Sequence, residues 1–132
     1  MTEALKPRSG GCHCGAVRFT ADLPDQIVGL SCNCSICAMT GFIHVIVEPE
    51  HFHLEKGEGE QTEYTFTTRT AKHLFCPNCG VKSWYHPRSH PGTISINLRC
   101  FDSDQNLSGR IVDFDGANWE KNVEQINPEL GA

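Results

Sequence analysis

The sequence contains no apolar run long enough to span a membrane, which takes about 20 consecutive apolar residues. Its N-terminal stretch, MTEALKPRSGGCHCG, also lacks the continuous apolar segment of a secretory signal peptide. Both absences argue against the membrane-spanning and secreted classes of protein. They predict a cytoplasmic chain with no membrane partner.

An excess of positive charge is also missing. Lysine and arginine number 11 against 16 aspartate and glutamate residues, for a net charge of -5, and the isoelectric point is near 5.7. Proteins that bind nucleic acids through a general electrostatic surface need the opposite balance. We therefore expect no nucleic-acid partner.

The chain shows no internal linker, low-complexity segment or repeat. Its 132 residues fit one domain. We expect a flexible lead-in over residues 1–8, a single folded domain over residues 9–126, and a frayed tail over residues 127–132.

Short segments with alternating apolar and polar residues recur along the chain, separated by glycine and proline. Such spacing is typical of a mainly β domain made of short antiparallel strands. The expected strands cover residues 16–21, 27–32, 43–47, 52–57, 62–68, 72–76, 82–86 and 93–98. One or two short helices are expected, over residues 34–40 and near residues 118–126.

Cysteine, in contrast, is abundant, with eight residues in this short chain. Thiols stay reduced in the cytoplasm, where clustered cysteines bind metals more often than they form disulfides. The cysteines therefore predict metal sites.

Two cysteine pairs are each followed directly by glycine, in CHCG and in CPNCG. A glycine there can take a positive φ angle, which turns backbone N–H groups toward the sulfurs. Two such turns facing each other would form a closed four-thiolate zinc site from Cys12, Cys14, Cys76 and Cys79. CPNC could instead be a thioredoxin-like redox pair, but the βαβ context of that motif is absent.

Three further cysteines, Cys32, Cys34 and Cys37, lie close together in SCNCSICAMTG. Cys34 and Cys37 are spaced to share one face of a helical turn that Asn33 can cap and Gly41 can end. Three thiolates with an exchangeable fourth position are the pattern of a catalytic zinc site. A soft exchangeable position suits a substrate sulfur and hence chemistry at a carbon–sulfur bond.

One alternative remains open, because Cys100 could supply a fourth thiolate to this second set. The protein would then hold two closed, structural zinc ions and act as a non-catalytic structural or interaction module. A lone cysteine beside Phe101 is more often a small buried apolar residue. His44 and His73 are candidate proton donors, although the simpler interpretation is that they pack within strands.

The motifs GGCHCGAVRF, CNCSICAMTG and FCPNCG, in this order, resemble the glutathione-dependent formaldehyde-activating enzyme family. The segments YTFTTRTAKHLFCPNCGVKSWYHPRSHPG and FDGANWE are similar to the subgroup that includes centromere protein V. The resemblance implies a β-tent fold with two zinc ions per chain. One is structural, at Cys12, Cys14, Cys76 and Cys79, and the other is catalytic, at Cys32, Cys34 and Cys37.

The resemblance further implies a zinc-dependent carbon–sulfur lyase that joins a glutathione-like thiol to an aldehyde, as in formation of S-hydroxymethylglutathione. A small thiol such as glutathione is then the expected partner. Arg88, in the turn HPRSHPG, is a candidate to hold a carboxylate of that thiol. The sequence does not indicate an oligomeric state.

Overall fold

The computed structural model describes residues 4–33, 35–66, 71–87, 90, 92–103 and 107–114. These residues form ten strands, one α-helix and two short 3₁₀ helices. The strands are β1 (Lys6–Gly11), β2 (Arg18–Leu23), β3 (Gln26–Cys32), β4 (Ile43–Val47), β5 (Phe52–Lys56), β6 (Thr62–Tyr64), β7 (Lys72–Phe75), β8 (Trp84–His86), β9 (Ile94–Asn97) and β10 (Ser108–Phe114). The helices are α1 (Ser35–Thr40), η1 (Pro49–His51) and η2 (Leu98–Cys100). The mainly β prediction is confirmed.

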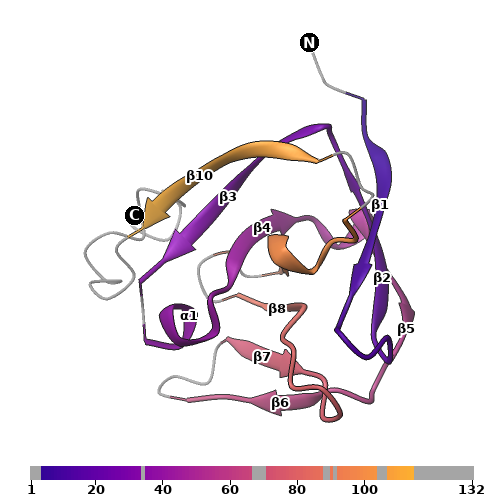
Figure 1. The fold of residues 1–132 in the computed structure, drawn as a ribbon, viewed down its shortest axis with the longest axis vertical. Helices are drawn as coiled ribbons and strands as arrows, with labels where there is room; N and C mark the ends of the chain where they lie inside the picture. The colour runs from indigo at the N-terminus through magenta and orange to yellow at the C-terminus, as the bar shows by residue number, and fades with distance from the viewer. Residues whose placement is uncertain are drawn as a thin grey trace.

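The strands form two sheets (Figure 1). The smaller sheet has the order β1-β2-β5, and the larger has the order β10-β3-β4-β9-β8-β7-β6. An isolated bridge between Gly10 and Phe101 joins β1 to the segment that follows η2. The two sheets therefore meet at the end of β1, where the first cysteine motif begins.

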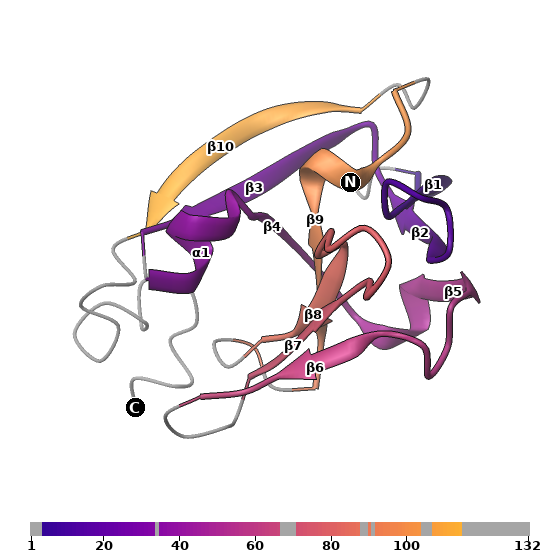
Figure 2. The same ribbon diagram turned by 60° about the horizontal axis from the view of Figure 1, so that its bottom comes forward.

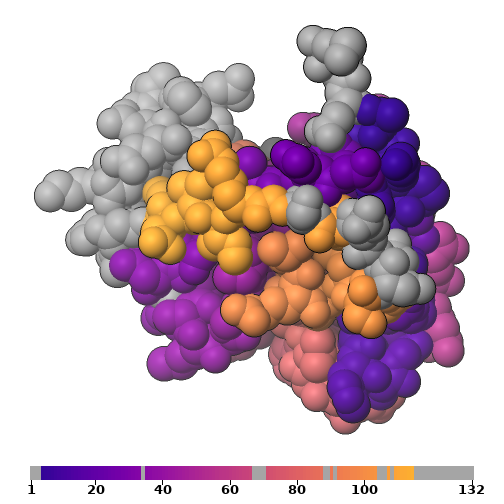
Figure 3. All heavy atoms as spheres, turned by 45° about the horizontal axis from the view of Figure 1, so that its top comes forward, coloured from indigo at the N-terminus to yellow at the C-terminus, as the bar shows by residue number. Residues whose placement is uncertain are grey.

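Most neighbouring strands are antiparallel, as expected, but β10 runs parallel to β3. In the space-filling view β10 lies at the surface of the molecule (Figure 3). Neither β10 nor β1 was among the expected strands. Residues 6–8, which we expected within a flexible lead-in, form the first half of β1 and pair with β2. The helix expected near residues 118–126 and the tail at 127–132 lie outside the described residues.

The hydrophobic core joins both sheets. Phe19 of β2, Val45 of β4, Trp84 of β8 and Ile96 of β9 are all buried within it. Burial of branched and aromatic side chains on one face of each strand is what stabilises a sheet against its neighbour. On β4 and β9 the alternation of strand side chains then directs His44 and Ser95 to the opposite face of the large sheet.

The helix α1 follows β3 directly and lies against it (Figure 2). It ends at Gly41, whose φ of 67° is left-handed and whose N–H donates to the Cys37 carbonyl at 3.0 Å. The expected helix and its glycine stop are confirmed. Among the described residues, no helix combines the length and the apolar character required to cross a membrane.

Candidate metal centre

The first cysteine turn, Cys12–Val17, follows β1. The Cys12 N–H donates to the Val17 carbonyl at 3.1 Å, and the Val17 N–H donates to the Cys12 sulfur at 3.3 Å. Gly15 takes a φ of 84° and donates its N–H to the Cys12 carbonyl. The glycine conformation is therefore the one that the motif predicts.

The second cysteine turn, Cys76–Val81, follows β7 and has the same backbone design. The Cys76 N–H donates to the Val81 carbonyl at 3.1 Å, and the Gly80 N–H donates to the Cys76 carbonyl at 2.7 Å. Gly80 has a φ of 75°. Both turns are thus stabilised by local backbone hydrogen bonds.

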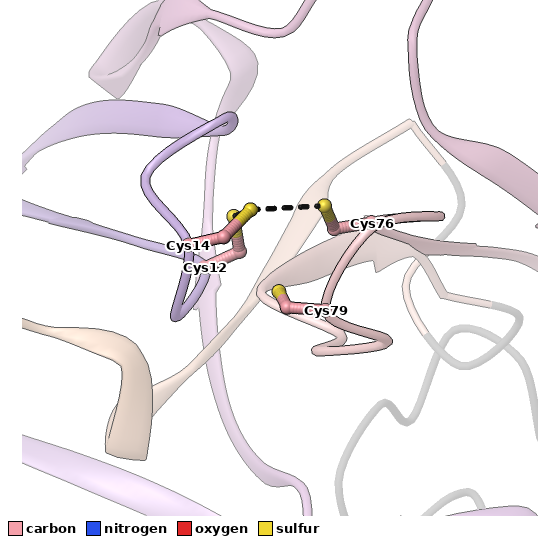
Figure 4. Close-up of side chains that lie close together, drawn as sticks. All are labelled: Cys12, Cys14, Cys76 and Cys79. Carbon is pink, nitrogen blue, oxygen red and sulfur yellow. Dashed lines mark hydrogen bonds between the residues drawn. The ribbon is translucent and has the colours of Figure 1, made fainter.

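The two turns face each other and bring four sulfurs together (Figure 4). We call Cys12, Cys14, Cys76 and Cys79 the closed cluster; their sulfurs all lie within 4.8 Å of one another. The Cys12–Cys14 and Cys14–Cys76 sulfur separations are 3.7 and 3.6 Å. A tetrahedral zinc with bonds of about 2.3 Å separates its sulfurs by roughly 3.8 Å. The donor set and its spacing therefore fit a closed zinc site.

In the absence of metal, the pKa values of Cys79 and Cys14 in the closed cluster are shifted in opposite directions. Burial opposes ionisation of Cys79, but the backbone N–H groups of Cys14 and Val81 outweigh it and lower the pKa of this thiol to about 6. At Cys14 the Ala16 N–H favours the thiolate, yet the neighbouring Cys76 and burial raise the pKa to about 11. Four thiolates this close repel one another, and a divalent cation offsets that repulsion.

The second cysteine set consists of Cys32, Cys34 and Cys37. Cys32 ends β3, and Cys37 is the buried residue of α1. Cys34 lies outside the described residues. Among the residues that are described, neither Cys32 nor Cys37 belongs to a group of three or more such ligands that could hold a metal ion. Three thiolates are the soft donors that zinc accepts, so the chemistry of this set fits the metal.

His44 of β4 lies beside this second set. Its Nε2 is 3.2 Å from the Cys37 sulfur, and its Nδ1 is 2.9 Å from the Ser95 hydroxyl oxygen. The Tyr85 hydroxyl lies 3.3 Å from the same Nδ1. All four side chains are buried. The second cysteine set therefore adjoins a polar cluster drawn from three strands.

The strand register continues this cluster across the large sheet. Ser95 pairs with Tyr85, and Tyr85 pairs with His73. The His73 ring stacks on Tyr85 with centroids 4.8 Å apart. We call His44, Ser95, Tyr85 and His73 the polar row. Buried Lys82 adjoins it, with its Nζ 2.6 Å from His73 Nδ1 and 3.9 Å from the Tyr85 ring centroid.

Cys100 contacts neither set as a ligand among the described residues. It lies in η2, where its thiol is 3.8 Å from the Lys82 carbonyl oxygen. Burial, followed by the charges of Cys12 and Cys79, raises the pKa of the Cys100 thiol to about 11. Among the described residues, its charged neighbours therefore belong to the closed cluster.

The family model of the glutathione-dependent formaldehyde-activating enzyme matches residues 7–116. The chain belongs to this family. It is also similar in structure to a Rhodobacter sphaeroides protein known from a crystal structure, with 31% sequence identity and a TM-score of 0.64. That match covers 77% of this chain and 98% of the other.

Membership in the formaldehyde-activating family links the chain to glutathione-dependent formaldehyde activation. Enzymes of this family are zinc-dependent, and the closed cluster is a set of residues able to hold zinc. The family match spans both cysteine turns and the second set. It therefore agrees with the resemblance drawn from the cysteine motifs.

The structure brings further polar side chains to the second cysteine set. His44 and His73 are buried in strands, as the simpler interpretation expects. His44 also contacts the Ser95 hydroxyl of β9, and His73 contacts the Lys82 amine in the segment before β8. Lys82 and Ser95 were not considered as site residues. In the sequence, Ser95 stands out only as a polar residue between two apolar residues of a strand, and Lys82 only as a charged residue next to a strand. Arg88 lies outside the described residues and stays a prediction.

Proposed function

We propose that the protein is a zinc-dependent carbon–sulfur lyase that joins a glutathione-like thiol to an aldehyde, with one structural and one catalytic zinc. The structural ion would lie in the closed cluster. The catalytic ion would be held by Cys32, Cys34 and Cys37. The reaction forms a bond between the thiol sulfur and the aldehyde carbon, and the thiol proton ends on the aldehyde oxygen.

One observation carries this proposal most directly. Four cysteines are gathered into one cluster, and Cys100 has the charges of that cluster as its neighbours. This arrangement supports leaving the second cysteine set with three thiolates and an open fourth position, which is the pattern of a catalytic rather than a structural site. A zinc ion there would supply a soft exchangeable position that accepts a thiol sulfur.

The residues around Cys37 have complementary tasks. The burial of Cys37 and of the adjoining polar row keeps bulk water away from this part of the site. Tyr85 and Lys82 bring a hydroxyl and an amine to the same face of the sheet. We propose that these polar groups hold the aldehyde oxygen and deliver the proton that it gains. Arg88 stays our candidate for binding a carboxylate of the thiol.

Calorimetry with glutathione and S-methylglutathione tests the proposal. Glutathione should bind and release a proton near neutral pH, because a free thiol has a pKa near about 8.5 and must ionise to bind metal. The S-methyl compound cannot provide a thiolate and should bind at least tenfold more weakly, a difference of about 1.4 kcal/mol. Substitution Arg88→Ala should weaken both ligands equally.

Equal affinity for the two ligands would show that the thiol does not reach the metal. Binding of neither would favour the alternative of a non-catalytic module. Metal analysis of the same samples gives an independent check, since the proposal requires two zinc ions per chain and a single zinc ion would contradict it. The non-catalytic module with two closed sites also holds two zinc ions, so ligand binding is the measurement that separates it from the proposal.

A further inference from the structure

A chain of buried contacts leads from Cys37 through His44 to Ser95. The Cys37 sulfur faces His44 Nε2 at 3.2 Å, and Ser95 Oγ faces His44 Nδ1 at 2.9 Å. The three side chains come from α1, β4 and β9. Cys37 and His44 are 5% and 6% exposed, and Ser95 is 0% exposed. Polar groups at such buried positions need hydrogen-bond partners within the protein.

The position of the imidazole proton follows from the needs of Ser95. A neutral imidazole carries one N–H and offers one acceptor nitrogen. Among the described residues, His44 Nδ1 is the partner that the structure gives to Ser95 Oγ. If Nδ1 carried the proton, the buried Ser95 hydroxyl hydrogen would lack an acceptor, which is unfavourable for a buried donor.

The Tyr85 hydroxyl supports the same assignment. It lies 3.3 Å from His44 Nδ1, so two O–H groups face this one nitrogen. As an acceptor, Nδ1 can receive the Ser95 hydroxyl hydrogen, and the Tyr85 hydroxyl lies within reach of the same lone pair. The ring proton then resides on Nε2, which points at the Cys37 sulfur.

We propose that His44 donates its Nε2–H to the Cys37 thiolate and is a positioning residue for this sulfur, with Ser95 fixing the tautomer. The part of the inference that concerns metal rests on the proposed function, because it takes Cys37 to be a ligand of the second zinc. An N–H donated to a thiolate is a charge-assisted hydrogen bond and draws negative charge from the sulfur. It also fixes the direction in which the sulfur presents its remaining lone pairs.

Two consequences follow for the second site. Hydrogen-bond partners of metal ligands typically change metal affinity by about 10–100-fold when they are removed. Less charge on the Cys37 sulfur also makes the bound ion a better acceptor for an incoming thiol. His44 thus acts through Cys37 and does not occupy the fourth position, which stays available for substrate.

Cobalt-loaded protein provides the test, because thiolate-to-cobalt charge-transfer bands report on the ligand sulfurs. The variants are His44→Gln and His44→Ala, with His53→Gln as the control, since His53 is half exposed and lies on the small sheet. Glutamine keeps an N–H donor near the place of Nε2 but is a poor ligand for zinc or cobalt. His44→Ala should lower the affinity of the second cobalt by about 10–100-fold, with a shift of its charge-transfer band to lower energy. His44→Gln should stay within about threefold of the wild type, well inside that range.

Nitrogen NMR of ¹⁵N-histidine-labelled protein tests the tautomer without relying on the second metal. Wild-type His44 should carry its proton on Nε2 alone. Protonation of Nδ1, alone or together with Nε2, would overturn the assignment to Ser95. An unprotonated Nε2, with His44→Gln as damaging as His44→Ala, would identify His44 as a metal ligand and overturn the inference.

The failures of this inference and of the proposed function are distinguishable. If two cobalt ions bind and His44→Ala leaves the second affinity and spectrum unchanged, His44 has no role in positioning Cys37, while the proposed function stands. If the wild type binds one cobalt, the proposed function fails. The NMR result then decides whether the His44–Cys37 hydrogen bond is correct on its own.

Discussion

The two cysteine sets of this protein are organised in opposite ways. In the closed cluster, each pair of sulfurs is positioned by its own turn, through backbone hydrogen bonds between residues at most a few positions apart. In the second set, the described contacts of Cys37 lead to His44 on β4 and onward to Ser95 on β9. The sulfurs of each pair in the closed cluster are thus positioned by contacts within one turn, whereas Cys37 is positioned by contacts that lead to residues of other strands.

The side chains packed around the two cysteine sets also differ. Cys12 and Cys76 belong to the hydrophobic core cluster and are packed with Val17 and Trp84. Loss of metal there would leave four cysteines without their common ion, two of them inside the core, so metal binding and folding should be one event. Cys37 instead adjoins the polar row, whose strands are held by backbone pairing. The second metal should therefore be removable without unfolding.

The largest expected effect comes from substituting one ligand of each set. Cys79 and Cys32 are matched, because both side chains are half buried. Cys79→Ser should remove most of the folding free energy, since structural zinc contributes about 10–16 kcal/mol in small zinc domains. Cys32→Ser should leave a folded protein with one zinc. Circular dichroism and metal analysis measure both, and equal unfolding would mean that both sets are structural.

Chelation of the wild-type protein tests the same contrast by a smaller perturbation. A mild chelator should remove one zinc ion at a concentration at least tenfold below that needed for the other, because a site with three protein ligands binds less tightly than a closed one. The circular dichroism spectrum should persist after the first loss and collapse after the second. Simultaneous release of both ions with unfolding would contradict the comparison.

Two glycine substitutions provide an intermediate test. Gly80 and Gly41 both have left-handed φ angles, 75° and 67°, and a Cβ at either position would meet no atom within 4 Å. Each change to alanine should therefore cost about 1–2 kcal/mol through backbone strain alone. Gly80→Ala should weaken the metal of the closed cluster, and Gly41→Ala should weaken only the second metal. Metal titration of the two variants separates these outcomes, and a reversed pattern would show that the sets are coupled.

The smallest expected effect concerns Asp102, which links to the strands β1 and β2 that flank the first cysteine turn. Its carboxylate accepts from Arg18 at 3.1 and 2.5 Å and from the Ser9 hydroxyl at 3.1 Å. The Arg18 hydrogen bonds, opposed by burial and aided by Ser9, lower the pKa of Asp102 below its usual value. Because both partners are about one-third exposed, Asp102→Asn should cost no more than about 1 kcal/mol.

The sign of the pH dependence follows from the lowered pKa. The stabilisation by Asp102 is complete above the unfolded-state pKa of about 3.9 and is lost as the pH falls through the lower folded-state value. Urea unfolding should therefore give the same difference between wild type and Asp102→Asn at pH 7 and pH 5. If the difference in unfolding free energy between the two proteins is already smaller at pH 5 than at pH 7, the pKa of Asp102 is not lowered in the folded state. The affinity of the second metal should not change.

Much of the closed cluster could be predicted from the sequence alone. A cysteine pair followed by glycine specifies a turn through local backbone geometry, and both turns form as expected, with Gly15 and Gly80 at positive φ. The central strand β4 and the helix α1 were predicted for the same reason, because periodicity and a glycine stop are local signals. The strands β1 and β10 were missed, since β1 is rich in glycine and charge and β10 exposes Ile111 and Val112.

The sequence by itself marked the two cysteine turns of the closed cluster, because that information lies within a few residues of each sulfur, and the tertiary structure brings the two turns together. Only the tertiary structure decided that His44, Ser95, Tyr85 and His73 share one buried face. Their meeting depends on the order β4-β9-β8-β7 and on the register of each pair. A shift by one residue would send each side chain to the opposite face of the sheet. Register is fixed by long-range packing of the apolar face, so no spacing along the chain reveals it.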